Sequence, residues 1–545
     1  MALTVCRRGG HLDGVERLPL VVHEDDDLLV IDKPAGWNTH APNPWAGEGV
    51  YEWLRDREPR WASLAILHRL DQATSGLLVF GKTPRANRSL TRQFAEGRVR
   101  KRYLLLTDRP PLGEPRVIRQ AIVRAGPRYQ VAEPAAGGQP AETRFEPAGR
   151  EGRWTRLAAE PRTGRTHQIR VHAAWAGFPI LGDTLYGGSP FGRVCLHAAE
   201  LAFRHPADDR EVRFRSEPDF ETPPHRARRR AIIDPAETDA FRLIHGEPDG
   251  WPEWQVDRLG GWLLAVSETD GPGAADLARL EELARAEKAA GVYHRRRERH
   301  VRERRPEEVR PEPVFGRAAE GPVWVRENGL RFRLDFGQGY SVGLFLDQRD
   351  NRRRWLTRHV AAGFGPLRPK AGAARLLNLF AYTCAFSVAA AAGGWETTSL
   401  DLSRGYLEWG RENFRANELD PAQHDFIYGD ALDWLKRLAR RGRRFEAVIL
   451  DPPTFSTSKR GVFRAERDYP ALVEAALGVL APEGVLFAST NAGGLTPPAF
   501  VDRVTEAVRA AGRRVLASHY APQPPDFPIT PKSPPHLKSL WLRVG

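Results

Sequence analysis

The residues whose types and spacing best suit catalysis lie in the segment 68–76, which reads HRLDQATSG. Its one carboxylate, Asp71, follows Arg69 closely and precedes Leu77–Phe80, an apolar run typical of a buried strand. Such a carboxylate can act as a nucleophile or a base if a nearby cation keeps it ionised. A lone aspartate at a turn is more often a backbone cap. The length and composition of the surrounding motif favour the catalytic interpretation.

A second set of polar and aromatic residues lies in the C-terminal half, at the ends of successive apolar runs. The set comprises Asn378, Phe380, Tyr382, Thr383, Asp401, Asp430, Asp451 and Phe455. Asp401 ends a run about 20 residues after the first one, a spacing typical of α/β units in which an acid contacts ribose hydroxyls. Any one of these acids could be a helix cap. Together they favour a nucleotide-containing cofactor.

The elements that must position these residues predict a multidomain protein. In 1–226, short β-like runs alternate with Gly/Pro turns and a helix at 84–97, which predicts an α+β domain. The polar, basic stretch 223–230 is interpreted as a linker. Residues 234–322 predict a small α+β domain.

From 323 to 545 the pattern becomes regular β-α-β alternation, which predicts a doubly wound, Rossmann-like α/β domain. The strands are expected at 375–379, 397–400, 445–450 and 485–488, and the helices include 404–417 and 469–480. The charged run 295–310 is as typical of a solvated face or a loose linker as of an RNA contact.

Composition restricts the partners and the compartment. The net charge of +13, mostly arginine, favours a polyanionic partner such as RNA, DNA or an anionic membrane. Three cysteines are too few for a disulfide scaffold and lack metal-ligand spacing, so we expect no metal centre and a reducing compartment. No signal peptide and no run of about 18 apolar residues is visible. We therefore expect a cytoplasmic protein with no membrane span.

The N-terminal motifs resemble the RluA family of pseudouridine synthases. Besides 68–76, the matching segments are 29–36 (LVIDKPAG), 163–172 (TGRTHQIRVH) and 180–187 (ILGDTLYG). The resemblance implies that Asp71 is the catalytic carboxylate, that Arg165 is its ion-pair partner and that Tyr103 stacks on the uracil. It also implies that Arg69 fills the space left by the extruded base, and that no cofactor is needed.

The C-terminal motifs resemble class I RNA methyltransferases of the RlmI/RlmK type, more closely the RlmK half that makes 7-methylguanosine in large-subunit rRNA. The supporting segments include 342–349 (VGLFLDQR), 402–409 (LSRGYLEW) and 451–459 (DPPTFSTSK). The resemblance implies S-adenosylmethionine as cofactor, with contacts from Asp347 and Arg349 as well as the strand-end residues above. Asp451 and Phe455 would act on the base, and 23S rRNA would be the partner.

The chemistry of the acceptor separates two outcomes. Methylation of cytosine C5 needs a cysteine thiolate that first adds to C6, and RlmI-like enzymes carry this cysteine after the fifth strand. Here that segment, 487–493, reads FASTNAG and has no cysteine. Guanine N7 already offers a lone pair, so positioning it in line with the methyl group could suffice. The missing thiol favours guanine N7, with cytosine C5 or an exocyclic amine as alternatives.

A third alternative is a ribosome-assembly factor that uses both domains only to hold RNA. The acids at 71, 401 and 451 count against it, because binding alone gives a cationic protein no use for them. The sequence therefore predicts a bifunctional RNA-modifying enzyme.

Overall fold

A computed structural model describes residues 18–133, 137–297, 309–339, 341–367, 374–458 and 461–545. The chain forms two compact units. The first contains residues 1–42, 49–55 and 63–234, and the second contains 43–48, 56–62 and 235–545. Most of the charged run 295–310 lies outside the described residues. No helix in the described ranges is both long and apolar enough to cross a bilayer.

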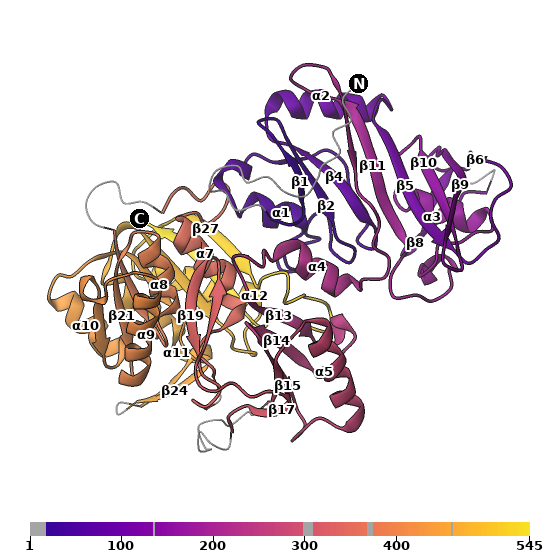
Figure 1. Ribbon diagram of the computed structural model, residues 1–545. Coiled ribbons are helices and arrows are strands. Elements are labelled where there is room, and N and C mark those ends of the chain that lie inside the picture. The colour runs from indigo at the N-terminus through magenta and orange to yellow at the C-terminus, as the bar shows by residue number, and fades with distance from the viewer. Residues whose placement is uncertain (1–17, 134–136, 298–308, 340, 368–373, 459–460) are drawn as a thin grey trace. The chain divides into compact units, whose positions relative to one another are not determined.

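The first unit is built on a ten-stranded sheet of order β1-β2-β4-β11-β5-β10-β9-β6, with β3 paired to β4 and β12 to β11 (Figure 1). The strands are β1 Val21–Glu24, β2 Leu28–Lys33, β3 Ala65–Ile66, β4 Ser75–Gly81, β5 Arg100–Thr107, β6 Arg116–Ile118, β7 Ile122–Ala125, β8 Arg128–Val131, β9 Thr143–Glu151, β10 Trp154–Pro161, β11 Leu196–Arg204 and β12 Glu211–Arg215. Strands β7 and β8 form a separate hairpin. The helices are α1 Val50–Arg55, α2 Pro84–Ala95, α3 Gln168–Trp175 and α4 Pro224–Ile232.

Two helices cover the two halves of this sheet. Ala86 and Leu90 of α2 pack with Leu77 and Val79 of β4 in one buried cluster, which also includes residues of β2 and β11. Helix α3 packs with residues of β5, β9 and β10 in another cluster. The strands β4, β11 and β5 are adjacent, so the loops at their ends lie where the two halves meet.

Two local features of the first unit correct or refine the sequence interpretation. The stretch 223–230 is mostly helix α4 rather than a linker, because Pro224 can occupy the first helical turn and Ile232 is buried. Gly76 has φ of +115°, and a Cβ there would lie 2.5 Å from backbone atoms of Ala198. Only glycine therefore lets β4 approach β11 directly after the Asp71 loop.

The second unit begins with a five-stranded sheet of order β13-β14-β15-β16-β17. Its elements are β13 Ala240–His245, β14 Gln255–Leu259, β15 Trp262–Ser267, α5 Ala274–Ala286, β16 Gly291–Arg296 and β17 Glu312–Gly316, followed by the hairpin of β18 Val323–Glu327 and β19 Leu330–Leu334. Helix α5 packs against the sheet, as predicted for a small α+β domain. The Tyr293 ring of β16 stacks on Phe336 at 4.0 Å, within a buried cluster that extends to α8 Ala385–Ala392 and α9 Arg404–Ala416. The boundary expected at 322 is therefore not a break in packing.

The rest of the second unit is a seven-stranded sheet of order β22-β21-β20-β23-β26-β28-β27. The strands are β20 Arg375–Leu379, β21 Glu396–Asp401, β22 Asp425–Tyr428, β23 Phe445–Leu450, β26 Leu480–Thr490, β27 Val515–Pro522 and β28 Lys538–Val544, with a hairpin of β24 Phe455–Ser458 and β25 Gly461–Arg464. The further helices are α7 Arg349–Thr357, α10 Ala431–Arg440, α11 Ala465–Leu477 and α12 Pro497–Ala510. The strands from β22 to β26 are parallel, and β28 is antiparallel to both neighbours.

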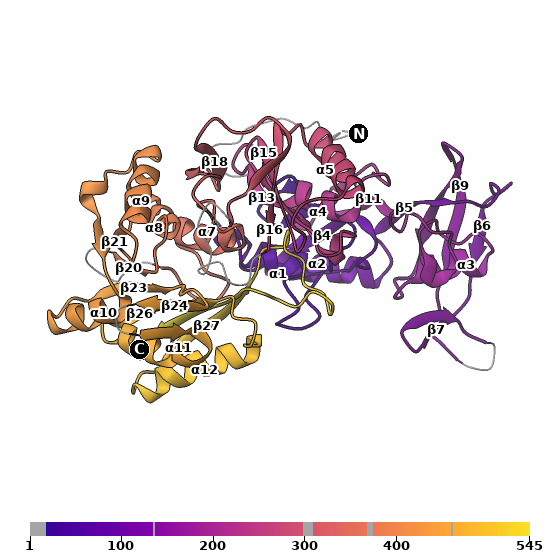
Figure 2. The ribbon, with the colours of Figure 1, turned by 90° about the horizontal axis from the view of Figure 1, so that it is seen from below.

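This sheet is covered on both faces, which explains why its strands are continuously apolar. Helices α10, α11 and α12 share one buried cluster with the sheet, and α7 and α8 share another. Figure 2 shows α11 and α12 on the side of the sheet opposite α8 and α9. The order of connection reverses between β20 and β23, and ligands of such sheets bind at this switch point, beyond the carboxyl ends of the strands.

Candidate functional sites

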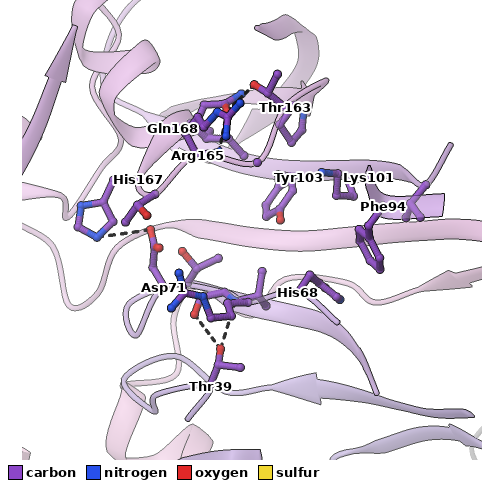
Figure 3. Close-up of a pocket in the computed structure, with 18 of the residues that line it drawn as sticks. Thr39, His68, Asp71, Phe94, Lys101, Tyr103, Thr163, Arg165, His167 and Gln168 are labelled. Carbon is purple, nitrogen blue, oxygen red and sulfur yellow. Dashed lines mark hydrogen bonds and ion pairs between the residues drawn. The ribbon is translucent and has the colours of Figure 1, made fainter. Parts of the chain in front are cut away.

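The Asp71 loop opens into a pocket of about 1290 Å³ in the first unit (Figure 3). Its lining includes Arg69, Asp71, Tyr103, Arg165 and Arg170. The pocket therefore brings together all the residues that the sequence selected in this domain.

Backbone contacts fix the loop that carries Asp71. The Thr39 hydroxyl donates to the Leu70 carbonyl at 2.8 Å and accepts from the Leu70 N–H at 3.1 Å (Figure 3). On the other side of Asp71, the Gly36 N–H donates to the Gln72 carbonyl at 2.7 Å. The fully buried Lys33 ammonium donates to the Trp37 carbonyl at 2.8 Å. The 29–36 segment thus positions the Asp71 loop.

The ion-pair partner of Asp71 is Arg170, which corrects the prediction for Arg165. Arg170 Nη1 lies 3.5 Å from Asp71 Oδ2. Arg165 is exposed, and its Nε donates to the Pro140 carbonyl at 3.1 Å. The physical reason is the turn at His167, whose φ of 56° starts α3 at Gln168. Arg170 then lies in the buried first turn of the helix, whereas Arg165 stays in the preceding loop.

A second carboxylate, which the sequence reasoning did not select, holds Arg170 in place. Asp183 accepts from Arg170 Nε at 2.7 Å and from Nη2 at 2.8 Å, and both side chains are buried. Burial alone would lower the pKa of Arg170, but the bond to Asp183 and the charges of Asp183 and Asp71 raise it. Asp183 lies in the motif segment 180–187. A buried arginine needs an acid partner, and this need could have pointed to Asp183 as a site residue.

His167 and Tyr186 complete the surroundings of Asp71. His167 Nδ1 lies 2.7 Å from the Tyr186 hydroxyl, and Nε2 lies 3.8 Å from Asp71 Oδ2. Burial lowers the pKa of His167 despite the nearby acids, which favours the neutral imidazole. Arg170 is therefore the main source of positive charge beside Asp71.

Tyr103 and Arg69 line the same pocket. Tyr103, on β5, is half-buried, and burial followed by the charge of Asp71 raises the pKa of its hydroxyl. It stays neutral at physiological pH, as a stacking ring should. Arg69 is exposed, so its guanidinium can move into space that a displaced base leaves. Their roles in catalysis stay predictions.

In the second unit, the loop after β20 is strained at alternate residues. Phe380, Tyr382 and Cys384 have φ of 60°, 48° and 61°, in the left-handed region that non-glycine residues seldom adopt. Each such residue costs on the order of 1 kcal/mol, and strain of this kind concentrates at ligand sites. At three positions with larger side chains the loop thus adopts a conformation that glycine would adopt without strain.

Asp401 lies beside this loop at the carboxyl end of β21. Its Oδ2 accepts from the Tyr382 N–H at 2.9 Å and its Oδ1 from the Ser403 N–H at 2.8 Å. Burial raises the pKa of Asp401, although backbone hydrogen bonds oppose the shift. Leu402 and Tyr428 next to it are 43% and 52% exposed. An acid flanked by exposed apolar groups fits a nucleoside, with its ribose on the carboxylate and its base on the apolar surface.

The other predicted cofactor residues have internal partners. The Asn378 amide donates to Ser387 Oγ at 2.9 Å inside the fold, and Thr383 Oγ1 donates to the Gly343 carbonyl at 2.7 Å. Asp430 caps α10 by accepting from the Asp433 N–H at 3.2 Å. Arg349 is buried and paired with Asp526 through contacts of 2.7 and 2.8 Å. These side chains shape the site from behind, and direct cofactor contacts from them stay predictions.

A buried polar cluster lies at the carboxyl ends of β23 and β26. Gln348 Nε2 donates to Asp451 Oδ2 at 3.2 Å and to Ser489 Oγ at 2.8 Å. Asp347, beside Gln348, accepts from His536 Nε2 at 3.1 Å. Gln348, Ser489 and His536 are not predictable as site residues from the sequence, because they lie far apart along the chain and only the fold brings them together.

The pKa values of the two acids in this cluster are shifted in opposite directions. Burial, with a contribution from Asp347, raises the pKa of Asp451 to about 6. Burial also opposes ionisation of Asp347, but the His536 hydrogen bond and the charges of His536, Arg242 and Arg352 lower its pKa. At neutral pH the protein keeps Asp451 ionised against the cost of burial, which is a mark of functional sites.

Phe455 and Cys384 occupy opposite environments. The Phe455 side chain is 42% exposed next to the Asp451 segment, as expected for a residue that stacks on a base. Cys384 is fully buried, and burial raises the pKa of its thiol to about 12. A Cβ on Gly410 would lie 2.4 Å from Cys384 Sγ, so the thiol packs tightly against α9.

Comparison with known families gives one match in each unit. The family model of S-adenosylmethionine-dependent methyltransferases matches residues 241–543, and that of RNA pseudouridylate synthases matches residues 27–175. The chain therefore belongs to the S-adenosylmethionine-dependent methyltransferase family and also carries an RNA pseudouridylate synthase domain. It is an enzyme of both classes, as the sequence predicted.

Individual relatives of the methyltransferase part of the chain can be named. A ribosomal RNA large subunit methyltransferase of Deinococcus radiodurans is 34% identical over 58% of this chain and 76% of its own length. Ribosomal RNA large subunit methyltransferase I of Klebsiella pneumoniae is 30% identical over 56% and 74%. The crystal structure of SMU.776, a putative methyltransferase complexed with SAH, is 26% identical over 56% and 76%, with a TM-score of 0.48. Residues 241–543 are thus similar in sequence to ribosomal RNA large subunit methyltransferases.

We expect Asp183→Asn to reduce kcat for pseudouridine formation by about 10²-fold with little change in KM, because misplacing a group by about 1 Å can cost that much. Arg170 would lose one of its two charged hydrogen bonds and its fixed orientation toward Asp71. Tritium release from labelled uridine in RNA measures the rate. Asp208→Asn, which alters an exposed acid of the same unit, is the control. Wild-type kcat in Asp183→Asn would contradict this role.

We expect Asp451→Asn to stabilise the second unit at pH 8. An acid whose pKa rises on folding from 3.8 to about 6 favours the folded state when protonated and loses this contribution as pH rises through the interval. The gain should be at most about 3 kcal/mol at pH 8 and about half of that at pH 5. Thermal unfolding of both proteins at the two pH values measures it. A gain that does not depend on pH would contradict the buried ionised carboxylate.

Proposed function

We propose that this protein isomerises uridine to pseudouridine at the Asp71 pocket and methylates guanine N7 of 23S rRNA at the Asp451 site. The observation that carries the first activity is the position of the Asp71 carboxylate, 3.5 Å from Arg170. This arginine is buried and donates two hydrogen bonds to Asp183. The observation that carries the second is the absence of a usable thiol. Cys384 is the only cysteine in residues 235–545, and it is buried in a packed interface.

The isomerisation needs no external reagent. The C1′–N1 bond breaks, the uracil turns, and a C1′–C5 bond forms while the C5 proton leaves and N1 gains one. Arg170 supplies a positive charge 3.5 Å from Asp71, whose carboxylate acts as nucleophile or base beside the sugar. Tyr103 supplies a neutral ring for the uracil, and Arg69 occupies the space that the base leaves in the RNA stack, at a cost of a few kcal/mol for extrusion.

The methyl transfer relies on positioning. S-adenosylmethionine supplies an electrophilic methyl group, and Asp401, Leu402 and Tyr428 are the residues that would hold its nucleoside part. Phe455 stacks on the extruded guanine, and the ionised Asp451 accepts hydrogen bonds from donors of the base. Because N7 carries a lone pair and no proton, no general base has to act at the reacting atom.

The two activities should separate in single variants. Asp71→Ala should abolish pseudouridine formation and leave methyl transfer intact. Asp401→Ala should weaken S-adenosylmethionine binding by about 10-fold or more, the loss expected for hydrogen bonds to a charged group, and leave isomerisation intact. Pseudouridine mapping and calorimetry measure the two effects. Isomerase activity in Asp71→Ala, or unchanged cofactor affinity in Asp401→Ala, would refute the respective assignment.

The methylated nucleoside identifies the acceptor. After incubation with unmodified 23S rRNA and S-adenosylmethionine, nucleoside mass spectrometry should detect 7-methylguanosine, and Cys384→Ser should give the same product at a similar rate. Formation of 5-methylcytidine that is lost in Cys384→Ser would establish a thiol mechanism instead. An N-methyl product on an exocyclic amine would exclude guanine N7 as the acceptor.

A further inference from the structure

The pocket of the first unit is larger than one nucleoside requires. Its volume of about 1290 Å³ exceeds the roughly 300–1,000 Å³ of most small-molecule sites. Besides the surroundings of Asp71, the lining includes His68, Phe94, Val99 and Lys101. Figure 3 shows His68, Phe94 and Lys101 beyond Tyr103, on the side away from His167. We call this part of the pocket, lined by His68, Phe94 and Lys101, the Lys101 arm.

One wall of the Lys101 arm is flat and uncharged. The His68 and Phe94 rings stack with centroids 4.7 Å apart and planes 27° from parallel. His68 Nε2 accepts from the Val79 N–H at 3.2 Å. Burial, with a contribution from Lys101, lowers the pKa of His68 to about 3, so the ring is neutral at physiological pH. A neutral aromatic wall beside the uridine site suits a second base or ribose.

Lys101 adds a cation to this arm. It lies two residues before Tyr103 on β5, so both side chains project from the same face of the strand, about 7 Å apart along it. Its side chain is partly buried, and burial lowers its pKa. Within the described residues, no carboxylate lies within 4 Å of the Lys101 ammonium and no acceptor takes a hydrogen bond from it.

The other charged residues along this arm are already paired. Arg100 pairs with Glu211, and Arg102 lies 3.5 Å from Glu146. The acids that line the same part of the pocket are likewise neutralised, since Glu96 pairs with Arg98 and Glu200 lies 3.0 Å from Arg215. Lys101 therefore carries the net charge of the arm.

A desolvated ammonium without a counter-ion costs free energy that a bound anion can offset. We propose that the Lys101 arm binds the nucleotide next to the target uridine, with its phosphate on the Lys101 ammonium and its base or ribose along the His68–Phe94 wall. The proposal rests on the pseudouridine synthase activity proposed above. It adds a specific phosphate contact one nucleotide from the isomerised residue.

The test is the salt dependence of binding by the full-length chain to an eight-nucleotide oligouridylate. Each phosphate contact on a single strand contributes about −0.7 to the slope of log K against log salt concentration. Lys101→Met keeps the length of the side chain and removes its charge. It should weaken binding about five- to tenfold at low salt and reduce the slope by about 0.7. Lys101→Arg should restore most of both, since it restores the charge.

The matched control is Arg88→Met, which removes an exposed cation of α2 that does not line the pocket. It should change affinity less than twofold and leave the slope unchanged. In steady-state isomerisation, Lys101→Met should raise KM and keep kcat within about twofold. An unchanged slope in Lys101→Met, or a loss of kcat at unchanged KM, would overturn the proposal.

The outcome for the Lys101 arm can be separated from that for the isomerase. Asp71→Ala should keep the wild-type salt slope while it loses pseudouridine formation. If Asp71→Ala stays active, the isomerase assignment fails whatever the slope of Lys101→Met. If Asp71→Ala is inactive and Lys101→Met keeps the wild-type slope, only the subsite fails.

Discussion

Arg170 is the group on which the N-terminal site depends, because it is shared by two carboxylates with different duties. Asp183 is 1% exposed and takes two of its N–H groups, whereas Asp71 is 24% exposed and contacts the third nitrogen at a longer distance. The buried Asp183 offsets the cost of burying the Arg170 cation, and Arg170 in turn places a positive charge beside the more accessible Asp71. With Asp183 absent, two guanidinium N–H groups of the buried Arg170 would lose their carboxylate partner, and its orientation toward Asp71 would no longer be fixed. The asymmetry of the two pairs leaves Asp71 available to a substrate.

In the second unit, buried ion pairs between arginine and a carboxylate likewise fix the start of α7. Arg349 pairs with Asp526, and Arg352 pairs with Glu327 through two contacts of 2.6 Å, all within the protein interior. Gln348 directly precedes this helix and reaches Asp451. Since both arginines are held on either side, the orientation of Gln348 is set by ion pairs that lie outside the site itself. This explains why a segment rich in arginine is buried rather than exposed to RNA.

The sequence predicted the fold well where periodicity and strand order decide it. The strands at 375–379 and 445–450 and the helix beginning at Arg404 lie where the alternation placed them, because parallel strands covered on both faces must be continuously apolar. The prediction of a linker at 223–230 was wrong. The composition of this stretch is polar, and Ile232, which buries the helix, lies just beyond it. Composition describes the solvent-facing side of an element and says little about its packed side.

The candidate site was predictable in its motifs but not in its pairings. The segment 163–172 was selected correctly, yet a left-handed residue at His167 decides which of its arginines pairs with Asp71. Histidine adopts this conformation too seldom for the sequence alone to predict the turn. Likewise, the acids at strand ends were found, whereas Gln348 and His536 come from distant segments. The net charge of +13 favours a polyanionic partner but does not locate its binding surface, since many arginines form ion pairs inside the protein. What distinguishes Lys101 from them is that no carboxylate of the described residues lies within 4 Å of its ammonium. This property depends on which side chains the fold brings next to β5, so it exists only in the folded chain.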